Sequence, residues 1–492
     1  MPLSRRPLPA LMALAALATL AAAAPAGTAA TDERAKARPA TRTAPPATTA
    51  WTAADLKTAA ALRDQLRAGS EAFGFVRDLT TEVGPRSAGS AGDAAAVKWA
   101  VARLEAMGFP RVYTQEVTVP HWERGELEVR TESPFPQRLV AASLGGSIGT
   151  AEQGLSAEVV RFDSLEALKA AGEEVVAGKI VFLDQRMQRD AMGKGYGITV
   201  RGRADGASLA ASKGAVAIAI RSVGTDVNSR FAHTGGVIYA INAPRIPAVA
   251  LSHPDADQLA RQLTTAAARQ APVKLFIRSS ARELPMTKSA NVIAEIPGSD
   301  RADEVVVVGG HLDSWDQGHG AIDDGAGVAI ASAAAHAIRV KGLKPRRTVR
   351  VVLWANEEFG LSGANEYARR ERPHLERHYG AIEADFGGAR VLQFSTKVSE
   401  AALPAMRQLH GVLAPLGIEW GNNEATGGAD LRPLRGEGVP VFSLAQDGTL
   451  YFDYHHTPND TLDKIDPVAL DQATAAYAVV VWLLAQAEQP LR

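Results

Sequence analysis

The feature that most constrains the fold is a run of four valines, Val305–Val308, which leads directly into "GGHLDSWDQGHGAIDDGAG" at residues 309–327. An apolar run of this kind is typical of a strand buried on both faces of a parallel sheet. Two histidines and four aspartates follow it without an obvious turn to solvent. Buried charge is costly unless the groups pair or bind a metal. The stretch therefore predicts a polar site at the end of a buried strand.

The C-terminal half of the chain alternates short apolar strands, such as "TVRVVLWANEE" and "VPVFSLAQ", with helical patterns. Helices are predicted over residues 326–340, 362–371, 400–413 and 467–488. This alternation predicts an α/β fold with a mostly parallel, mixed sheet flanked by helices. The apolar stretch at 473–487 is too short to span a bilayer and is expected to be a core helix.

Four of the predicted strands lead to residues that could bind a metal. The candidates are His311 with Asp313 and Asp323-Asp324, then Glu357-Glu358, then Asp385, and finally Tyr454-His455-His456. Each one alone has an ordinary explanation, since Asp324 could cap a helix and Glu357 could be solvated. In open α/β sheets, however, ligands bind at the carboxyl ends of the strands. Imidazole and carboxylate without thiolate favour zinc over manganese or cobalt.

The N-terminus predicts an exported protein. Arg5-Arg6 precede an apolar run that ends near Ala23, and Ala24-Pro25-Ala26 suits a signal peptidase, so residues 1–26 are predicted to be a signal peptide. A membrane anchor is the alternative, but the apolar core is short. The export route, Sec or twin-arginine, stays open. Without any cysteine the chain has no site for a lipid on that residue, so no stable membrane association is expected after cleavage. The protein is expected to be secreted or periplasmic.

The remaining chain is predicted to form a divided catalytic domain. Residues 27–50 lack large apolar side chains and are predicted to be a disordered linker. The catalytic domain is predicted at 51–155 and 264–492, with a smaller β-rich α+β domain inserted at 156–263, because 492 residues exceed one ordinary core. The insertion holds no catalytic cluster and is expected to shape or cover the cleft. A net charge of -1 gives no indication of a nucleic-acid partner.

The N-terminal part of the catalytic domain and the insertion also contain predicted elements. Ser90 and Asp93 predict a capping box that opens a helix ending at Gly108. Residues 112–119 alternate as a strand does. Within the insertion, a helical segment is predicted at 205–213.

The polar motifs resemble those of a known family. "HLDSWDQGHGAIDDGAG", "NEEFGLSGANEYA", "EADFGG" and "YHHTPNDT" are similar, in order and approximate spacing, to the motifs of the co-catalytic dizinc exopeptidases of clan MH, most closely those of the carboxypeptidase Q type. "GPRSAGSAGDAAAVKWAVARLEAMGF" (84–109) resembles their N-terminal segment, and the insertion resembles a protease-associated domain. The resemblance implies the zinc exopeptidase fold and hydrolysis of dipeptides or short peptides.

The resemblance also implies a role for individual residues. It places His311 and Asp385 on one Zn²⁺, Glu358 and His456 on a second, and Asp323 between the two. Glu357 is the implied general base, which takes a proton from the attacking water. The family pattern further implies that the Asp323–Asp324 peptide bond is cis.

Several other residues are expected near the metals or the substrate. Asp313 is expected to orient His311. The motif selects His456 rather than His455 as the ligand, which leaves His455 or Tyr454 to face substrate. His319 is expected to line the pocket or to play a structural part, and Asp430 to lie near the site or cap a helix.

The substrate terminus that is recognised stays open. A free C-terminus is favoured, with Arg432 and Arg435 as the nearest cations for a carboxylate. An aminopeptidase on the same centre is the alternative, and a homodimer is compatible with the family. A non-catalytic binding protein of receptor type is a remote alternative, because all five implied ligands are present.

Overall fold

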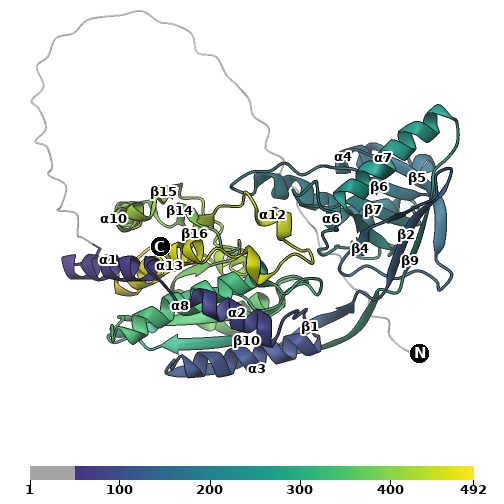
Figure 1. The fold of residues 1–492 in the computed structure, drawn as a ribbon. Helices are drawn as coiled ribbons and strands as arrows, with labels where there is room; N and C mark the ends of the chain where they lie inside the picture. The colour runs from purple at the N-terminus through teal and green to yellow at the C-terminus, as the bar shows by residue number, and fades with distance from the viewer. Residues whose placement is uncertain (1–49) are drawn as a thin grey trace, which may run out of the picture. The chain divides into compact units, whose positions relative to one another are not determined.

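The structure, a computed structural model, describes residues 50–492. The signal peptide predicted at 1–26 lies outside the described residues, as does the linker predicted at 27–50 apart from Ala50. The described residues form two eight-stranded sheets, each with its own helices (Figure 1).

The first sheet carries the predicted α/β architecture. Its strands follow the order β1 (Arg111–Glu123), β10 (Arg282–Ile296), β12 (Arg347–Trp354), β11 (Arg301–His311), β13 (His378–Glu383), β16 (Val441–Gln446), β14 (Val391–Lys397) and β15 (Glu419–Trp420). The central strands β12, β11, β13 and β16 run parallel. β1 and β10 pair antiparallel with their neighbours, whereas β14 pairs antiparallel with β16 and parallel with β15. The prediction of a mostly parallel, mixed sheet is confirmed.

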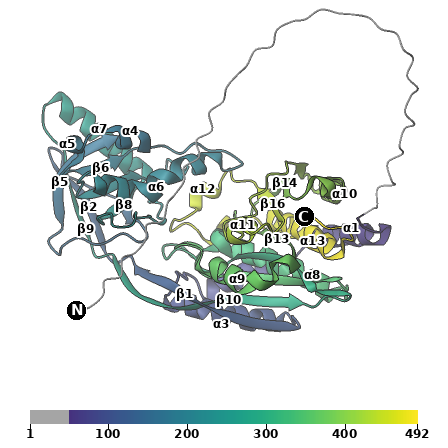
Figure 2. The same ribbon diagram turned by 180° about the vertical axis from the view of Figure 1, so that it is seen from behind.

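The valine run in β11 is buried on both faces because helices cover both. Val306 and Val308 pack in the core that contains α8 (Ala326–Val340) and α13 (Pro467–Gln486). Val305 and Val307 pack on the other side, with α9 (Ser362–Glu371) and α11 (Arg432–Gly436). Figure 2 shows α9 and α11 together on that side of the sheet. The strand is therefore continuously apolar rather than alternating.

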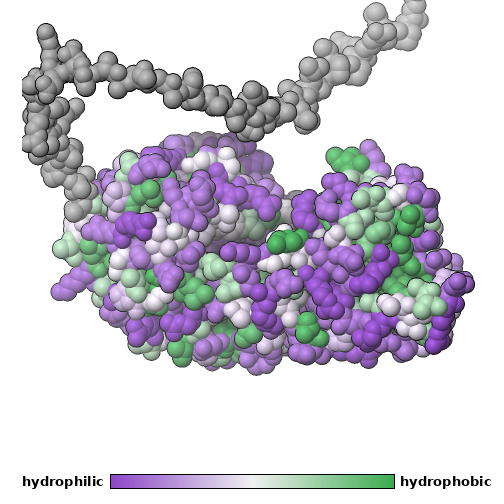
Figure 3. Space-filling model, turned by 90° about the horizontal axis from the view of Figure 1, so that it is seen from above, coloured by the Kyte–Doolittle hydropathy of each residue, from purple (hydrophilic) through white to green (hydrophobic). Residues whose placement is uncertain are grey.

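Two further helices complete this layer. α1 (Ala53–Arg67) packs against α13, and α2 (Ala72–Glu82) packs against α8. α13 is long and apolar enough to cross a membrane, but 89% of its most apolar window is buried, so it is the predicted core helix. On the face seen in Figure 3, hydrophilic residues predominate and hydrophobic ones lie in small groups between them.

Most predicted helix bounds are confirmed. α8 and α9 begin and end at the predicted residues, and α10 (Leu403–Leu413) and α13 differ by two or three. α3 (Ala91–Ala106) begins at the predicted cap, where Ser90 Oγ accepts from the Asp93 amide at 3.2 Å. The Asp93 carboxylate accepts from the amide of Gly89, at 2.8 Å, and not from Ser90 as a capping box requires.

The second sheet builds a separate lobe. Its order is β3 (Gln137–Leu139), β2 (Leu127–Ser133), β9 (Lys274–Ser279), β5 (Leu155–Phe162), β6 (Ile180–Leu183), β7 (Ala217–Arg221), β8 (Ala248–Leu251) and β4 (Ala141–Ser143). Residues 127–279 are called the β2–β9 lobe below, and they extend beyond the predicted insertion at both ends. Its helix α6 (Lys194–Ser212) runs longer than the single helical segment predicted there, at 205–213, and α7 (His253–Ala268) was not predicted. The antiparallel pair β1 and β10 connects this lobe to the first sheet.

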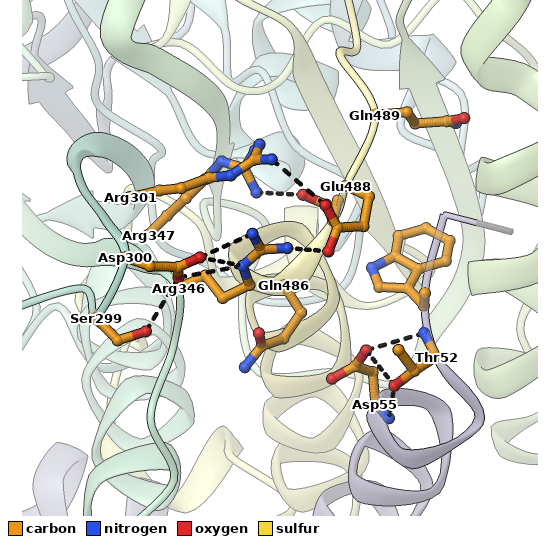
Figure 4. Close-up of polar contacts among 12 residues, drawn as sticks. Thr52, Asp55, Ser299, Asp300, Arg301, Arg346, Arg347, Gln486, Glu488 and Gln489 are labelled. Atoms are coloured by element: carbon orange, nitrogen blue, oxygen red, sulfur yellow. Dashed lines mark hydrogen bonds and ion pairs between the residues drawn. The ribbon is translucent and has the colours of Figure 1, made fainter. Parts of the chain in front are cut away.

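At the amino ends of β11 and β12, charged residues neutralise one another. Arg346 pairs with Asp300 at 2.8 Å and also with Glu488, and Glu488 lies 3.4 Å from Arg301 (Figure 4). These ion pairs tie the C-terminal segment to the sheet. At the carboxyl ends of the same strands lie the predicted metal ligands.

Candidate metal centre

The predicted ligands meet at the carboxyl ends of four neighbouring strands. His311 ends β11, Glu358 lies just after β12, and Asp385 lies just after β13. His456 follows β16 and the short helix α12 (Tyr451–Tyr454), and Asp323 lies in the turn before α8. Because these strands are parallel neighbours, their carboxyl ends share one edge of the sheet. Asp323 and His456, 133 positions apart in the sequence, are thereby brought into contact.

The first group of polar atoms surrounds His311. Its Nε2 atom lies 3.1 Å from Asp323 Oδ1 and 3.6 Å from Asp385 Oδ1. Ligand atoms at about 2.0–2.1 Å from a tetrahedral zinc are separated from one another by about 3.3–3.4 Å. These three residues therefore have the spacing of atoms around a common ion.

A second group uses the other oxygen of Asp323. His456 Nε2 lies 3.2 Å from Asp323 Oδ2 and 3.1 Å from Glu358 Oε2. His455 Nε2 is 3.5 Å from the same Asp323 oxygen, and the two imidazoles stack with centroids 3.5 Å apart. Asp323, His455 and His456 also have the spacing of atoms around a common ion. Within residues 50–492, His456 is the one of the two imidazoles that also reaches a second carboxylate. Asp323 thus stands between two groups, each of which could hold a metal.

The buried carboxylates of these groups need a cation to balance their charge. Burial raises the pKa of Glu358 and of Asp385, and the charge of the nearby Asp323 raises both further. Within residues 50–492, neither Glu358 Oε1 nor Asp323 Oδ2 accepts a hydrogen bond. Buried anionic oxygens without donors are destabilising unless a cation balances them. The donor set of imidazoles and carboxylates fits zinc.

Glu357 lies beside this centre but outside both groups. Burial raises its pKa well above the usual range, and the charges of Asp385 and Glu358 raise it further against the opposing charge of His311. The side chain lines the pocket described below. A carboxylate with a raised pKa is a better proton acceptor.

Asp313 connects the two strand ends. Its carboxylate accepts from the amides of Glu357, at 3.0 Å, and Glu358, at 3.4 Å. Its backbone oxygen lies 3.0 Å from His311 Nδ1, whereas the carboxylate is 3.6 Å from that atom. The contact expected between Asp313 and His311 is therefore closest through the backbone, and the carboxylate fixes the doubled glutamates.

The turn from Asp323 into α8 lies close to the strands. The Asp323–Asp324 bond is cis, as the resemblance implies. The Asp324 carboxylate accepts from the amides of His311, at 3.0 Å, and Gly327, at 3.1 Å. A Cβ atom on Gly327 would lie 1.9 Å from the Ala384 oxygen, so only glycine lets the helix begin here.

A pocket of about 540 Å³ opens onto both groups. Its wall includes Asp323, Glu357, Glu358, Asp385, His455 and His456. Tyr196, Arg203 and residues 236–238 of the β2–β9 lobe form part of the opposite wall, and Arg432 lies at the edge of α11. Clefts between packed units are common sites for small ligands.

Two of the surrounding candidates lie outside the pocket wall, and the third lies buried near Glu383. His319 is exposed and is not part of the pocket wall, and Tyr454 is half-buried and likewise absent from it. Asp430 is fully buried, and its amide donates to Glu383 Oε2 at 3.0 Å. Burial, with the neighbouring Glu383 charge, raises the pKa of the Asp430 carboxyl well above its usual range.

Three residues that hold the site had no role predicted from the sequence. Arg86 is fully buried and donates to the backbone oxygens of Leu312, at 2.5 Å, and Gly320, at 2.8 Å. It thereby closes the loop that carries His311. Arg86 lies within the segment "GPRSAG", whose resemblance to the family was its only signal.

The other two are acidic. Asp460 accepts from the amides of Ile322, at 2.7 Å, and Asp323, at 3.3 Å, and so supports the bridging residue. It lies inside the motif "YHHTPNDT". Glu383, which accepts from the Asp430 amide, lies two residues before Asp385 and opens the motif "EADFGG", which was its only signal in the sequence.

Comparison with known proteins agrees with this geometry. Residues 291–481 match peptidase family M28. Carboxypeptidase Q of Rattus norvegicus is 37% identical over 84% of this chain and 85% of its own length, and that of Homo sapiens is 35% identical over the same shares. The solved structure of a peptidase M28 precursor from Shewanella amazonensis SB2B is 49% identical, covers 89% of this chain and 98% of its own, and has a TM-score of 0.86. A zinc aminopeptidase from Bacillus subtilis, 19% identical with a TM-score of 0.61 over 86% of this chain and 98% of its own, shares the fold.

Proposed function

The chain belongs to peptidase family M28 and is a metallo-exopeptidase, and on that premise we propose that it is a secreted zinc enzyme that removes residues from dipeptides and short peptides with a free C-terminus. The two oxygens of Asp323 carry this proposal. They face His311 with Asp385 on one side, and His456 with Glu358 on the other. Two Zn²⁺ per chain account for both groups.

Bound zinc would supply Lewis acidity to the attacking water and to the scissile carbonyl. Glu357 takes the proton of that water and passes it to the leaving amine. The Asp313 carboxylate holds the Glu357 amide at 3.0 Å and keeps this residue at the pocket wall, next to ligand Glu358. The side chains of Glu358 and His456 are almost fully buried, which strengthens their electrostatic interactions.

Two guanidinium groups support recognition of a substrate carboxylate. Arg432 is exposed at the pocket edge, and in the described part of the chain its guanidinium has no hydrogen bond or ion pair. Arg203 lines the opposite wall and donates to Tyr196 at 2.9 Å. Guanidinium groups bind carboxylates with charge-assisted hydrogen bonds. The name of the carboxypeptidase Q relatives agrees with this orientation.

An aminopeptidase on the same centre is the second candidate. Glu357, Glu358 and Asp385 line the pocket and could also receive a substrate ammonium group. The Bacillus subtilis neighbour is described as an aminopeptidase, although its likeness establishes only the fold.

A peptide panel separates the two. The zinc-loaded protein is incubated with free, N-blocked and C-amidated forms of one dipeptide and one longer peptide, and products are read by mass spectrometry. We expect cleavage of the free and N-blocked forms and little cleavage of the C-amidated ones. Rapid release of the first residue from C-amidated peptides, with N-blocked dipeptides untouched, would establish the aminopeptidase.

Export rests on residues 1–26, and it has a direct test. The protein expressed with its full N-terminus should be recovered outside the cytoplasm, beginning near residue 27. Intact Met1 on a protein retained in the cell would contradict secretion.

A further inference from the structure

The β2–β9 lobe contacts the segment that carries His456, here called the histidine loop (residues 452–456). The Thr234 amide donates to the His456 backbone oxygen at 2.9 Å. The Thr234 oxygen in turn lies 3.3 Å from His456 Nδ1. Arg203 Nη1, also in the lobe, lies 3.4 Å from the same nitrogen. Since a backbone oxygen only accepts, the contact with Thr234 favours a proton on Nδ1, the tautomer that leaves Nε2 free to bind a metal.

The backbone of His456 needs such support. Its φ angle is 61°, in the left-handed region that residues other than glycine seldom adopt. Contacts on either side of the residue must therefore hold it. His233, also in the lobe, places Nδ1 2.8 Å from the His455 oxygen.

The beginning of the histidine loop is fixed by the same lobe. The Arg189 guanidinium donates to both oxygens of Asp453, at 2.9 Å and 2.6 Å. Thr225 Oγ1 donates to Asp453 at 2.7 Å, and the Thr225 amide donates to the Phe452 oxygen at 2.9 Å. Asp453 is buried, so these charge-assisted bonds are strong.

We infer that the β2–β9 lobe is a positioning element of the metal centre: Arg189 and Thr225, through Asp453, set the histidine loop so that His456 Nε2 faces Asp323 and Glu358. The lobe thus acts on metal affinity as well as on the pocket. Neither residue touches a ligand atom of the centre. The inference rests on the proposed dizinc function and extends it to residues outside the centre.

The test compares Arg189→Met and Thr225→Val with Arg161→Met. Arg161 is a matched control, because it pairs with a buried aspartate, Asp184, and its side chain is 39% exposed against 40% for Arg189. Arg161 lies in the β2–β9 lobe, as Arg189 does, but its partner Asp184 is not part of the histidine loop. Zinc content is measured by mass spectrometry against a competing chelator, together with kcat, KM and melting temperature. Thr225→Val removes one hydrogen bond and keeps the result interpretable if Arg189→Met does not fold.

We expect Arg189→Met and Thr225→Val to weaken one of the two zinc ions by roughly 10–100-fold, as loss of groups that orient a ligand does. At limiting zinc kcat should fall while KM changes little, and excess zinc should restore kcat. Arg189→Lys should retain part of the affinity, since it keeps the charge but not the paired hydrogen bonds. Arg161→Met should bind both ions as the wild type does.

Two failures are distinguishable. A wild-type protein that binds no zinc and cleaves no peptide would overturn the proposed function and this inference with it. If the wild type binds two ions and both Arg189→Met and Thr225→Val bind them equally tightly, the inference alone is overturned. A lower melting temperature of these variants would then show that the contact only stabilises the fold.

Discussion

Asp323 is the residue on which both metal groups depend, because each of its oxygens faces a different histidine. Replacing it with alanine takes one oxygen from each group at once. We expect Asp323→Ala to lower bound zinc from about two equivalents to less than one, with loss of hydrolysis, as measured by metal analysis after gel filtration. Asp316→Ala is the control, since Asp316 lies in the same loop but pairs with Arg124. Equal zinc in the two variants would rule out Asp323 as a ligand.

Glu357 should behave differently from its neighbour Glu358. Glu357→Gln preserves size and hydrogen bonding but cannot accept a proton, so kcat should fall by about 10²–10⁴-fold with both metals retained. Glu366→Gln, a change on α9 where the carboxylate pairs with Arg369 and Arg370, should leave kcat unchanged. A Glu357→Gln enzyme with near wild-type kcat would show that another group accepts the proton.

The residues that approach one another at the centre could be predicted, because each follows an apolar strand and belongs to a recognisable motif. The residues that hold them could not. Arg86 acts through backbone oxygens that come close only after folding, and Glu383 lies in a recognised motif whose spacing does not reveal its contact with Asp430. His319 and Tyr454 lie in the right loops, yet their side chains point elsewhere, since spacing does not determine the direction of a loop side chain.

At the scale of an element, the start of α3 gives a pH-dependent stability. Burial raises the pKa of Asp93 from 3.8 to about 6. A carboxyl whose pKa is higher in the folded state stabilises the fold fully below its unfolded pKa, and that contribution is lost as pH rises through 6. Between pH 4 and 8 the loss approaches about 3 kcal/mol, an order-of-magnitude figure at 1.36 kcal/mol per pKa unit.

Asp93→Asn should remove this dependence, because an amide oxygen can still accept from the Gly89 amide and the Ser289 hydroxyl. The free energies of unfolding of Asp93→Asn and wild type are measured by urea titration of metal-free protein. We expect the value of the variant relative to that of the wild type to increase from pH 4 to pH 8. A difference that stays constant with pH would show that Asp93 is ionised equally in both states.

The elements themselves were predictable to different degrees. α8 and α9 match their predicted bounds because helix periodicity and the flanking glycines are local signals. In the second sheet, by contrast, β2 pairs with β9 across more than 140 residues. No local pattern reveals such a pairing, and strands at 127–143 and 274–279 therefore fell outside the insertion predicted at 156–263.

At the scale of the whole described chain, the pocket depends on two sheets. The metal groups and Arg432 belong to the part around the first sheet, whereas Arg203 and Tyr196 belong to the β2–β9 lobe. A substrate that fills the pocket must contact both. The space of about 540 Å³ suits a dipeptide or the end of a longer peptide better than an extended chain.

Under the proposed function, Arg432 is expected to bind the C-terminal carboxylate of the peptide. If its guanidinium binds the terminal carboxylate, Arg432→Met loses a charge-assisted interaction, and KM for free dipeptides should rise by about 10- to 100-fold. Arg435→Met is the matched control on the same helix, because Arg435 donates to the Thr426 oxygen and is not part of the pocket wall. C-amidated peptides lack the carboxylate, so Arg432→Met should leave their slow cleavage unchanged. Steady-state kinetics on amidated and free forms of one dipeptide measure this interaction directly. Equal KM values for Arg432→Met and Arg435→Met on the free dipeptide would mean that Arg432 does not bind its carboxylate, and rapid cleavage of the amidated form would then favour recognition of the amino end.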